Sequence, residues 1–344
     1  MAPVEHLNPR QLRVLEAVIQ TYIETAEPAG SRTIAHRFGL GVSPATVRSI
    51  MSELEDQGLL YHPHTSAGRI PTDLAYRVYV DSLIRLAPPS TEARRTLQEE
   101  LPGSRSAMDQ LLRRTAQVLG VLTQELGVAV APTFDRVVLE RLELVQVSSE
   151  RLLMVLTLRS GAVRTVFVEV RGTIAKAALE RVVQVLNERL AGLTVEEIRR
   201  SLAERLRDIG GEPESHDLLN IFVAEREELF DFSGDAEQVV LGGAELLAEQ
   251  PEFSSNTKMR DLLHLTQRRD LLRQALQSRG EGLTITIGGE NLDPRLSDFT
   301  LVTASYRAGD LRGVIGVLGP TRMPYDKVIG LVEHTSQLVE GLLT

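Results

Sequence analysis

Side chains that could contact the phosphates and base edges of DNA are concentrated between positions 31 and 69 of the 344-residue chain. Arginine can offer paired N–H donors to guanine or to phosphate, whereas serine, threonine and histidine form single hydrogen bonds that suit several partners. The residues that we expect to contact DNA are Ser31, Arg32, Ser43, Ala45, Thr46, Arg48, Ser49, Ser52, His62, His64, Thr65, Ser66 and Arg69. Small side chains near the start of a helix suit a major groove, so the pattern indicates binding to double-stranded DNA.

Three helices and a hairpin must position these side chains. An Asn-Pro pair at 8–9 and a Ser-Pro pair at 43–44 are typical helix starts, and Ser31 can cap a short helix between them. The apolar spacing predicts a helix over about 9–24 and places Ala45, Ser49 and Ser52 on the outer face of a third helix that ends at Gly58. Residues 59–62 predict a strand and residues 63–70 a returning loop. This order is typical of a winged helix-turn-helix, although a protein-docking module has the same pattern.

Several runs of the sequence are distinctive: EPAGSRTI at 27–34, SPATVR at 43–48, HPHTSAGRIPTD at 62–73, PEF at 251–253, IGGEN at 287–291 and GVLGPTRM at 316–323. Together they resemble the HrcA family of heat-inducible transcription repressors. The run at 62–73 is highly specific, and together the runs span the chain. The resemblance implies a repressor of chaperone operons that binds an inverted-repeat operator of the CIRCE type as a homodimer. It also implies that the active fold depends on the GroE chaperonin.

One difference from the family falls within the expected DNA contact. After Thr46-Val47-Arg48 the family usually has Asn and an acidic residue, whereas this chain has Ser49 and Ile50. Ile50 lies on the buried face of the helix, but Ser49 points outward. An amide can bind adenine bidentately and a hydroxyl can bind any base, so we expect a shifted base preference.

The domain organisation follows from a change in pattern at Gly127. Strands are expected at about 128–131, 136–147, 152–158, 163–170, 283–287, 299–306 and 311–318, on both sides of a helical middle. This predicts an α+β protein: a winged-helix domain at 1–86, a helical connector at 87–126, and an antiparallel sheet domain at 127–209 and 279–344. The resemblance implies that the sheet domain is GAF-like and carries an inserted dimerisation domain, here 210–278. Leucines of a helix at 259–277 would be covered by a second copy.

Composition agrees with a globular, non-membrane protein. Hydrophobic residues make up 42% of the chain, cysteine is absent and the formal net charge is −9. The start lacks a basic and then apolar leader, and no apolar run is long enough to cross a membrane, so we expect the cytoplasm. Residues 1–86 hold eight arginines, no lysine and nine carboxylates. DNA affinity must therefore come from the placement of the arginines, because phosphate contacts act over about 8 Å at physiological salt.

Catalysis is not indicated by any motif. The sequence has no phosphate-binding Gly-Lys-Ser/Thr loop, no zinc-protease motif and no Gly-x-Ser-x-Gly elbow. His62 and His64 could bind a metal ion, but no cysteine or third histidine is near, so DNA contacts are favoured. Glu290 and Asp293 could suggest acid–base chemistry, but a capped turn after a strand explains their presence equally well. We therefore expect no enzyme, no cofactor and no metal. The alternative function is a ligand-sensing winged-helix regulator that uses the GAF-like domain, although no cluster of polar residues indicates a pocket.

Overall fold

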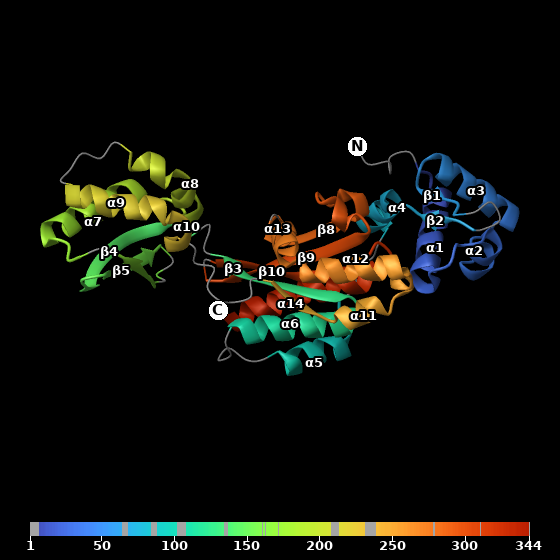
Figure 1. Cartoon of the computed structure of the whole chain (residues 1–344). Coiled ribbons are helices and arrows are strands. Elements are labelled where there is room, and N and C mark those ends of the chain that lie inside the picture. Colours follow the sequence, from blue (N-terminus) through green and yellow to red (C-terminus); the bar gives the residue numbers. More distant parts are fainter. Residues whose placement is uncertain are drawn as a thin grey trace. The chain divides into compact units, whose positions relative to one another are not determined.

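The structure is a computed structural model that describes residues 7–63, 68–83, 88–101, 108–133, 137–159, 161, 163–170, 172–207, 213–230, 239–277, 279–309 and 311–343. Helices and antiparallel strands are mixed, so the chain has an α+β fold (Figure 1). It divides into two compact units. The first comprises Met1–Ala131, Glu237–Tyr306 and Val314–Leu342, and the second comprises Pro132–Ala236, Arg307–Gly313 and Leu343–Thr344. No described helix is long and apolar enough to span a lipid bilayer.

The first unit begins with helices and a small hairpin. These elements are α1 (Pro9–Thr25), α2 (Ser31–Arg37), α3 (Pro44–Asp56), β1 (Leu60–Tyr61), β2 (Ile70–Pro71), α4 (Asp73–Val78) and the π-helix η2 (Tyr79–Leu83). Asn8 caps α1 by accepting the N–H groups of Arg10 and Gln11, as its Asn-Pro start predicts. Strands β1 and β2 pair antiparallel, with Leu60 opposite Pro71. We call residues 8–71 the N-terminal module.

A five-stranded sheet forms the rest of the first unit. Its strands, in the order β7-β3-β10-β9-β8, are β7 (Val239–Gly242), β3 (Leu126–Thr133), β10 (Leu311–Pro320), β9 (Phe299–Ala308) and β8 (Leu283–Ile287). Its helices are α5 (Thr91–Glu100), α6 (Met108–Thr123), α11 (Ala244–Ala248), η3 (Pro251–Phe253), α12 (Asn256–Gln267), α13 (Arg269–Gln277), η4 (Gly288–Glu290), η5 (Pro294–Leu296) and α14 (Tyr325–Leu343).

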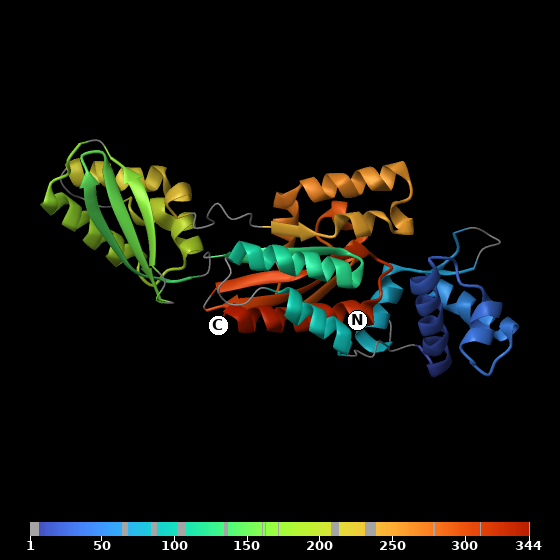
Figure 2. The ribbon, with the colours of Figure 1, turned by 90° about the horizontal axis from the view of Figure 1, so that it is seen from below.

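The two faces of this sheet are covered by different helices. Figures 1 and 2 show α12 and α13 on one side and α6 and α14 on the other. Alternate residues of β9 explain this arrangement, because successive side chains of a strand point to opposite faces. Leu301 joins the buried cluster that contains Leu265 of α12 and Leu272 of α13. Thr300 lies 3.2 Å from the hydroxyl of Tyr325 in α14.

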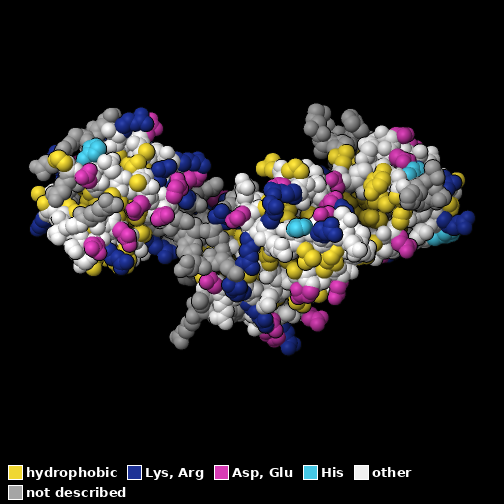
Figure 3. Space-filling model, viewed as in Figure 1, with side chains coloured by type: hydrophobic (Ala, Val, Ile, Leu, Met, Phe, Trp, Pro, Cys, Tyr) yellow, Lys and Arg dark blue, Asp and Glu magenta, His cyan; other side chains and the backbone are white. Residues whose placement is uncertain are grey.

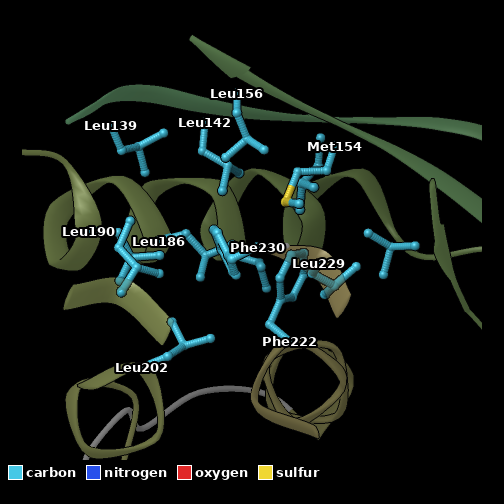
Figure 4. Close-up of a cluster of buried hydrophobic side chains, with 14 of the residues drawn as sticks. Leu139, Leu142, Met154, Leu156, Leu186, Leu190, Leu202, Phe222, Leu229 and Phe230 are labelled. Carbon is cyan, nitrogen blue, oxygen red and sulfur yellow. The ribbon is translucent and has the colours of Figure 1, made fainter. Parts of the chain in front are cut away.

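The second unit has its own sheet, in the order β4-β5-β6. Its elements are β4 (Leu139–Ser148), β5 (Arg151–Leu158), β6 (Val163–Glu169), α7 (Lys176–Leu190), α8 (Val195–Arg205), α9 (Pro213–Ala224) and α10 (Arg226–Leu229). The helices cover one face, where Leu142 and Met154 of the sheet meet Leu186, Phe222 and Phe230 (Figure 4). This apolar cluster gives the unit a core of its own.

The sheet arrangement corrects the prediction from sequence. Strands β4, β5 and β6 do not join the sheet of β8, β9 and β10. Strand β7, whose residues lie within the expected insertion 210–278, is an edge strand of that sheet. Val130 of β3 pairs with Val239 of β7, so the chain between them is inserted at the end of an antiparallel strand pair. The expected parts 127–209 with 279–344 and 210–278 therefore differ from the compact units. An alternating pattern marks a strand and its buried face, but it does not identify the neighbouring strand.

Two long helices expected from the apolar spacing are interrupted. The segment 91–126 forms α5 and α6, and β3 begins at Leu126; the segment 259–277 falls in α12 and α13, which are separated by the non-helical Arg268 (φ −91°, ψ 70°). Most leucines of α12 and α13 are buried within a single copy of the chain. Leu262, Leu265, Leu271, Leu272 and Leu276 belong to the cluster against the sheet, and of the six leucines in segment 259–277 only Leu263 is exposed.

Candidate nucleic-acid interface

A hollow of about 850 Å³ lies on the N-terminal module. Its lining residues are Ala29, Gly30, Ser31, Arg32, Pro44, Ala45, Arg48, Met51, Ser52, His62, Gly68 and Arg69. The residues expected from sequence that line it are Ser31, Arg32, Ala45, Arg48, Ser52, His62 and Arg69. The fold thus brings together the start of α2, one face of α3 and the hairpin. Three segments that are separate in sequence form one concave surface.

Helix α3 presents part of its expected face to the hollow. Ala45, Arg48 and Ser52 line it and are exposed, at a spacing of three and four residues that keeps them on one side of the helix. Ser49 is exposed but lies outside the lining, on the adjacent side of α3. The helix itself begins as its sequence predicts, since Ser43 precedes Pro44.

The hydroxyl groups of Ser43 and Thr46 serve the helix cap. The Ser43 Oγ accepts the N–H of Thr46 at 3.1 Å, and the two hydroxyl oxygens are 3.0 Å apart. Both residues remain exposed, so the cap leaves their outer surface open to solvent. Capping accounts for the identity of Ser43 without any ligand. Their expected role in DNA contact therefore stays a prediction.

The hairpin is held to α3 by a shared carboxylate. Glu55 lies 2.7 Å from the Nδ1 of His62 through Oε1 and 2.8 Å from an Nη of Arg69 through Oε2. The Arg69 side chain is only 12% exposed. Its backbone N–H and carbonyl both bond Ala29 at 2.9 Å, which fastens the hairpin to the loop before α2. The sequence alone does not indicate a role for Glu55, because its partners are brought to it only when the hairpin folds back.

Gly68 allows the hairpin to approach this loop closely. A Cβ added at Gly68 would lie 2.3 Å from the carbonyl oxygen of Ala29 and 2.6 Å from that of Pro28. No side chain fits at this distance, so glycine is required by packing rather than by its φ angle. The family-like runs at 27–34 and 62–73 meet here. His64, Thr65 and Ser66 lie outside the described residues.

Charge is distributed unevenly along α3. Its N-terminal half carries Arg48 and no acidic residue, whereas its C-terminal half carries Glu53, Glu55 and Asp56. Over the whole visible face in Figure 3, Lys and Arg side chains are mixed with Asp and Glu side chains. An anion is therefore favoured near the start of α3, where the helix dipole acts in the same direction.

Comparison with known proteins identifies the family. The model of the HrcA protein C terminal domain matches residues 109–329. The chain is also 38% identical over 350 residues to the heat-inducible transcription repressor HrcA of Chlorobium phaeobacteroides (strain BS1), covering 98% of this chain and 99% of that protein. The chain belongs to the HrcA family. The HrcA repressor of Prosthecochloris aestuarii is 38% identical over 95% of both chains.

A solved structure shares the fold of this HrcA family member. It is described as the crystal structure of a hypothetical protein at 2.2 Å resolution. The TM-score is 0.56 at 24% identity, and the match covers 98% of this chain and 99% of that chain. The relatedness to HrcA repressors confirms the resemblance found in the sequence. It also supports a role in the regulation of transcription.

Proposed function

We propose that the chain represses heat-shock gene transcription by binding double-stranded DNA through a winged helix-turn-helix. In this proposal α3 is the recognition helix and the β1–β2 hairpin is the wing. The observation that carries it is the hollow of the N-terminal module, where the start of α2, the outer face of α3 and the hairpin converge. Recognition helices of this class contact base edges with their N-terminal residues. The half of α3 that carries Arg48 is suited to that role.

Each part of the surface has a proposed role. Arg48, Ala45 and Ser52 face the major groove, Arg32 contacts a phosphate, and Ser49 on the adjacent side of α3 modifies base preference. His62 and Arg69 shape the wing through Glu55, and the wing tip reaches the DNA backbone or the minor groove. Few arginines take part, so one copy binds weakly. A defined operator read by two copies supplies the remaining affinity.

A second copy of the chain is the partner that an inverted-repeat operator of the CIRCE type requires, because two half-sites need two-fold symmetry. We propose that the copies meet at the open face of the β4–β5–β6 sheet, opposite its helices. Val145, Leu153 and Phe167 occupy one row across the three strands. Val145 and Phe167 are 50% and 57% exposed. A row of exposed apolar side chains can pack against its own copy, whereas the leucines of α12 and α13 other than Leu263 are already buried.

Dependence on the GroE chaperonin completes the proposal and rests on the family resemblance. The fold supports it in one respect: strands β3 and β7 pair although more than a hundred residues separate them in sequence. Long-range pairing slows folding and leaves apolar strands exposed meanwhile. A repressor that needs chaperonin would respond to free folding capacity in the cytoplasm. When heat-damaged proteins occupy the chaperonin, less repressor would reach its operator.

A second candidate function is ligand sensing by the five-stranded sheet domain, which we propose is GAF-like. A hollow of about 460 Å³ lies between α13, β8 and η5. Its polar lining residues include Arg279, Thr286 and Asn291, and Leu271 and Leu296 are among its apolar ones. Its size lies within the range of small-molecule sites. A metabolite that changed DNA affinity at fixed chaperonin concentration would favour this function over the chaperonin mechanism.

DNA binding is tested by fluorescence anisotropy on the promoter of the organism's own chaperone operon, with a scrambled duplex for comparison. Arg48→Ala should weaken specific binding, since Arg48 lines the hollow. Arg10→Ala is the matched control, because Arg10 is exposed on α1 outside the hollow. Equal affinity of the wild-type chain for operator and scrambled DNA would contradict the proposed function.

A further inference from the structure

The end of α1 is capped by a residue from the far end of the chain. Arg322 follows β10 and donates from Nη1 to the carbonyl oxygen of Ile23 at 2.7 Å. Ile23 lies in the last turn of α1, where helix carbonyls lack helical partners. Helix α1 has no basic residue of its own in that turn. Arg322 therefore supplies the positive charge that the C-terminal end of a helix dipole favours.

Other residues of the sheet domain hold the Arg322 guanidinium in place. Its Nε and Nη2 bond the two carboxylate oxygens of Glu252 at 2.5 and 3.0 Å, and Nη2 lies 3.3 Å from Oε1 of Gln250. The Arg322 side chain is 13% exposed. A bidentate pair fixes both the position and the plane of a guanidinium. The contact with α1 is thus made by a group that has little freedom to move.

A second attachment joins α4 to the turn after β8. Arg77 bonds both carboxylate oxygens of Glu290, at 2.8 and 2.5 Å, and the carbonyl of Ile285 at 2.8 Å. Asp73 at the start of α4 accepts the N–H of Gly289 at 3.0 Å. Burial would raise the pKa of Glu290, but the bonds from Arg77 and from the Ile287 N–H outweigh it, so this pKa lies below its ordinary value.

The backbone next to Glu290 is adapted to this attachment. Gly288 has φ +53°, and a Cβ there would lie 1.9 Å from a carboxylate oxygen of Asp73. Tyr76 of α4 adds an aromatic contact, since the centroid of its ring lies 5.7 Å from that of Tyr325 in α14. The family-like runs at 287–291 and 316–323 thus each contribute one attachment. Neither run contributes a residue to the lining of the hollow on the N-terminal module.

We propose that Arg322 and Arg77 are positioning residues for DNA binding, which fix the N-terminal module on the sheet domain. This inference rests on the proposed DNA-binding function. Neither residue lines the hollow of α2, α3 and the hairpin, so neither touches DNA in this scheme. The two attachments are made at different elements: Arg322 bonds the end of α1 within the module, and Arg77 fixes α4, the helix that directly follows the module. Two separate points prevent the rotation that a single linker would allow.

A fixed orientation affects the operator and a single half-site differently. Two recognition helices must enter the groove about 34–36 Å apart, or at multiples of that distance, for both half-sites to be occupied. A module that rotates freely can still bind one half-site. The second half-site is then bound at a lower effective concentration. This effective concentration can change the overall affinity by about 10² to 10⁴-fold. Positioning residues should therefore control binding of the full operator and its dependence on half-site spacing.

The test compares Arg322→Ala and Glu290→Gln with the wild-type chain on a full operator, on a single half-site and on operators of altered spacing. We expect the affinity of each variant for the full operator to fall about tenfold or more, because avidity is lost. The affinity for a single half-site should stay unchanged. We also expect a weaker dependence on spacing. Arg295→Ala is the matched control, since it removes an exposed ion pair with Asp293 near the same turn. Wild-type or tighter binding of the full operator, or equal losses on both DNAs, would overturn the inference.

A measurement without DNA separates this inference from the proposed function. The chain has no cysteine, so Arg13→Cys on α1 and Lys327→Cys on α14 would carry the only spin labels. Labelled chain is diluted with unlabelled chain, so that only distances within one copy are recorded. We expect one narrow distance distribution, which broadens when Arg322→Ala or Glu290→Gln is added. An unchanged distribution in both variants would refute the positioning role, whatever the chain binds.

Discussion

Arg69 is paired with Glu55, at 2.8 Å between an Nη and Oε2, and this contact joins the hairpin to the last turns of α3. The sequence predicted Arg69 as a DNA contact because it lies in the loop that was expected to form a wing. In the structure its side chain is largely buried and its main chain bonds Ala29. Arg48, by contrast, is exposed on the lining of the hollow. The two arginines should therefore behave differently when they are replaced.

Arg48→Ala should weaken operator binding without changing stability. If Arg48 reads a base, the loss should be about 1 to 3 kcal/mol and specificity should relax at that position. If it contacts a phosphate, the slope of log affinity against log salt should fall by about one. Anisotropy titrations at several salt concentrations distinguish the two. Wild-type affinity and slope would remove α3 from the interface.

Arg69→Ala should lower both stability and operator affinity. The loss of Arg69 leaves Glu55 with His62 as its remaining partner and loosens the hairpin. We expect the free energy of unfolding to fall by about 1 to 3 kcal/mol, as it does when other partly buried ion pairs are broken. Urea denaturation measures this value, and Glu55→Gln should reproduce part of it. A full loss of DNA affinity with wild-type stability would instead make Arg69 a direct contact.

Gly68→Ala tests the close approach of the hairpin to the loop before α2. The added methyl group would meet the Ala29 carbonyl oxygen at 2.3 Å, so the backbone must shift. We expect a loss of about 1 to 3 kcal/mol in the free energy of unfolding, together with weaker operator binding. Gly280→Ala is the control, because a Cβ there has no atom within 4 Å. Equal stability of the two variants would contradict this packing.

The elements of the N-terminal module could be predicted because their signals are local. A cap followed by proline starts α1 at Pro9 and α3 at Pro44, and the strand expected at 283–287 has those bounds. The Arg69–Glu55 and Arg322–Ile23 contacts join residues 14 and 299 positions apart, and no local pattern encodes them. The same limit applies to the sheets. Alternation located β4 to β6, but their partners depend on which apolar faces pack together.

The second unit should be removable without loss of the first. Val130 and Val239 are paired, so a short Gly/Ser linker in place of residues 134–238 would close an ordinary strand connection. We expect the shortened chain to fold, to be a monomer and to bind a single half-site. Sedimentation velocity and half-site titration check this. A shortened chain that remains a tight dimer would place the interface in the first unit.

Phe167→Lys tests the proposed contact of two copies on the open sheet face. Phe167 is 57% exposed, so a charge there should cost little in the free energy of unfolding of one copy. Within an apolar dimer contact the same charge would be desolvated and should separate the copies. Sedimentation at several concentrations gives the dimer dissociation constant. The control is Lys176→Ala on α7, which lies on the helical side of this unit. An unchanged dissociation constant for Phe167→Lys would exclude this face.

Glu125 should make stability depend on pH. Burial raises the pKa of Glu125 to about 8, and its Oε2 has no hydrogen-bond partner among the described residues. In the unfolded chain this carboxyl ionises near its ordinary value of 4.5. Between these values the folded state binds more protons than the unfolded state, so the free energy of unfolding falls as pH rises from about 4.5 to 8. Below that range the group does not oppose folding.

Glu125→Gln should remove this dependence, because glutamine stays neutral at every pH. We expect the variant to gain stability relative to the wild-type chain as pH rises from 5 to 8, by about 1 kcal/mol or more, since one pKa unit corresponds to about 1.4 kcal/mol. Urea denaturation at both pH values gives the difference, and subtracting the wild-type curve cancels the titration of other groups. Glu249→Gln is the control, since Glu249 is exposed at the end of α11.

Parallel pH curves for the wild-type chain and Glu125→Gln would mean that Glu125 is ionised and solvated in the folded protein. The close packing of its Oε2 against Gly319, where a Cβ would lie 2.2 Å away, argues for the neutral form.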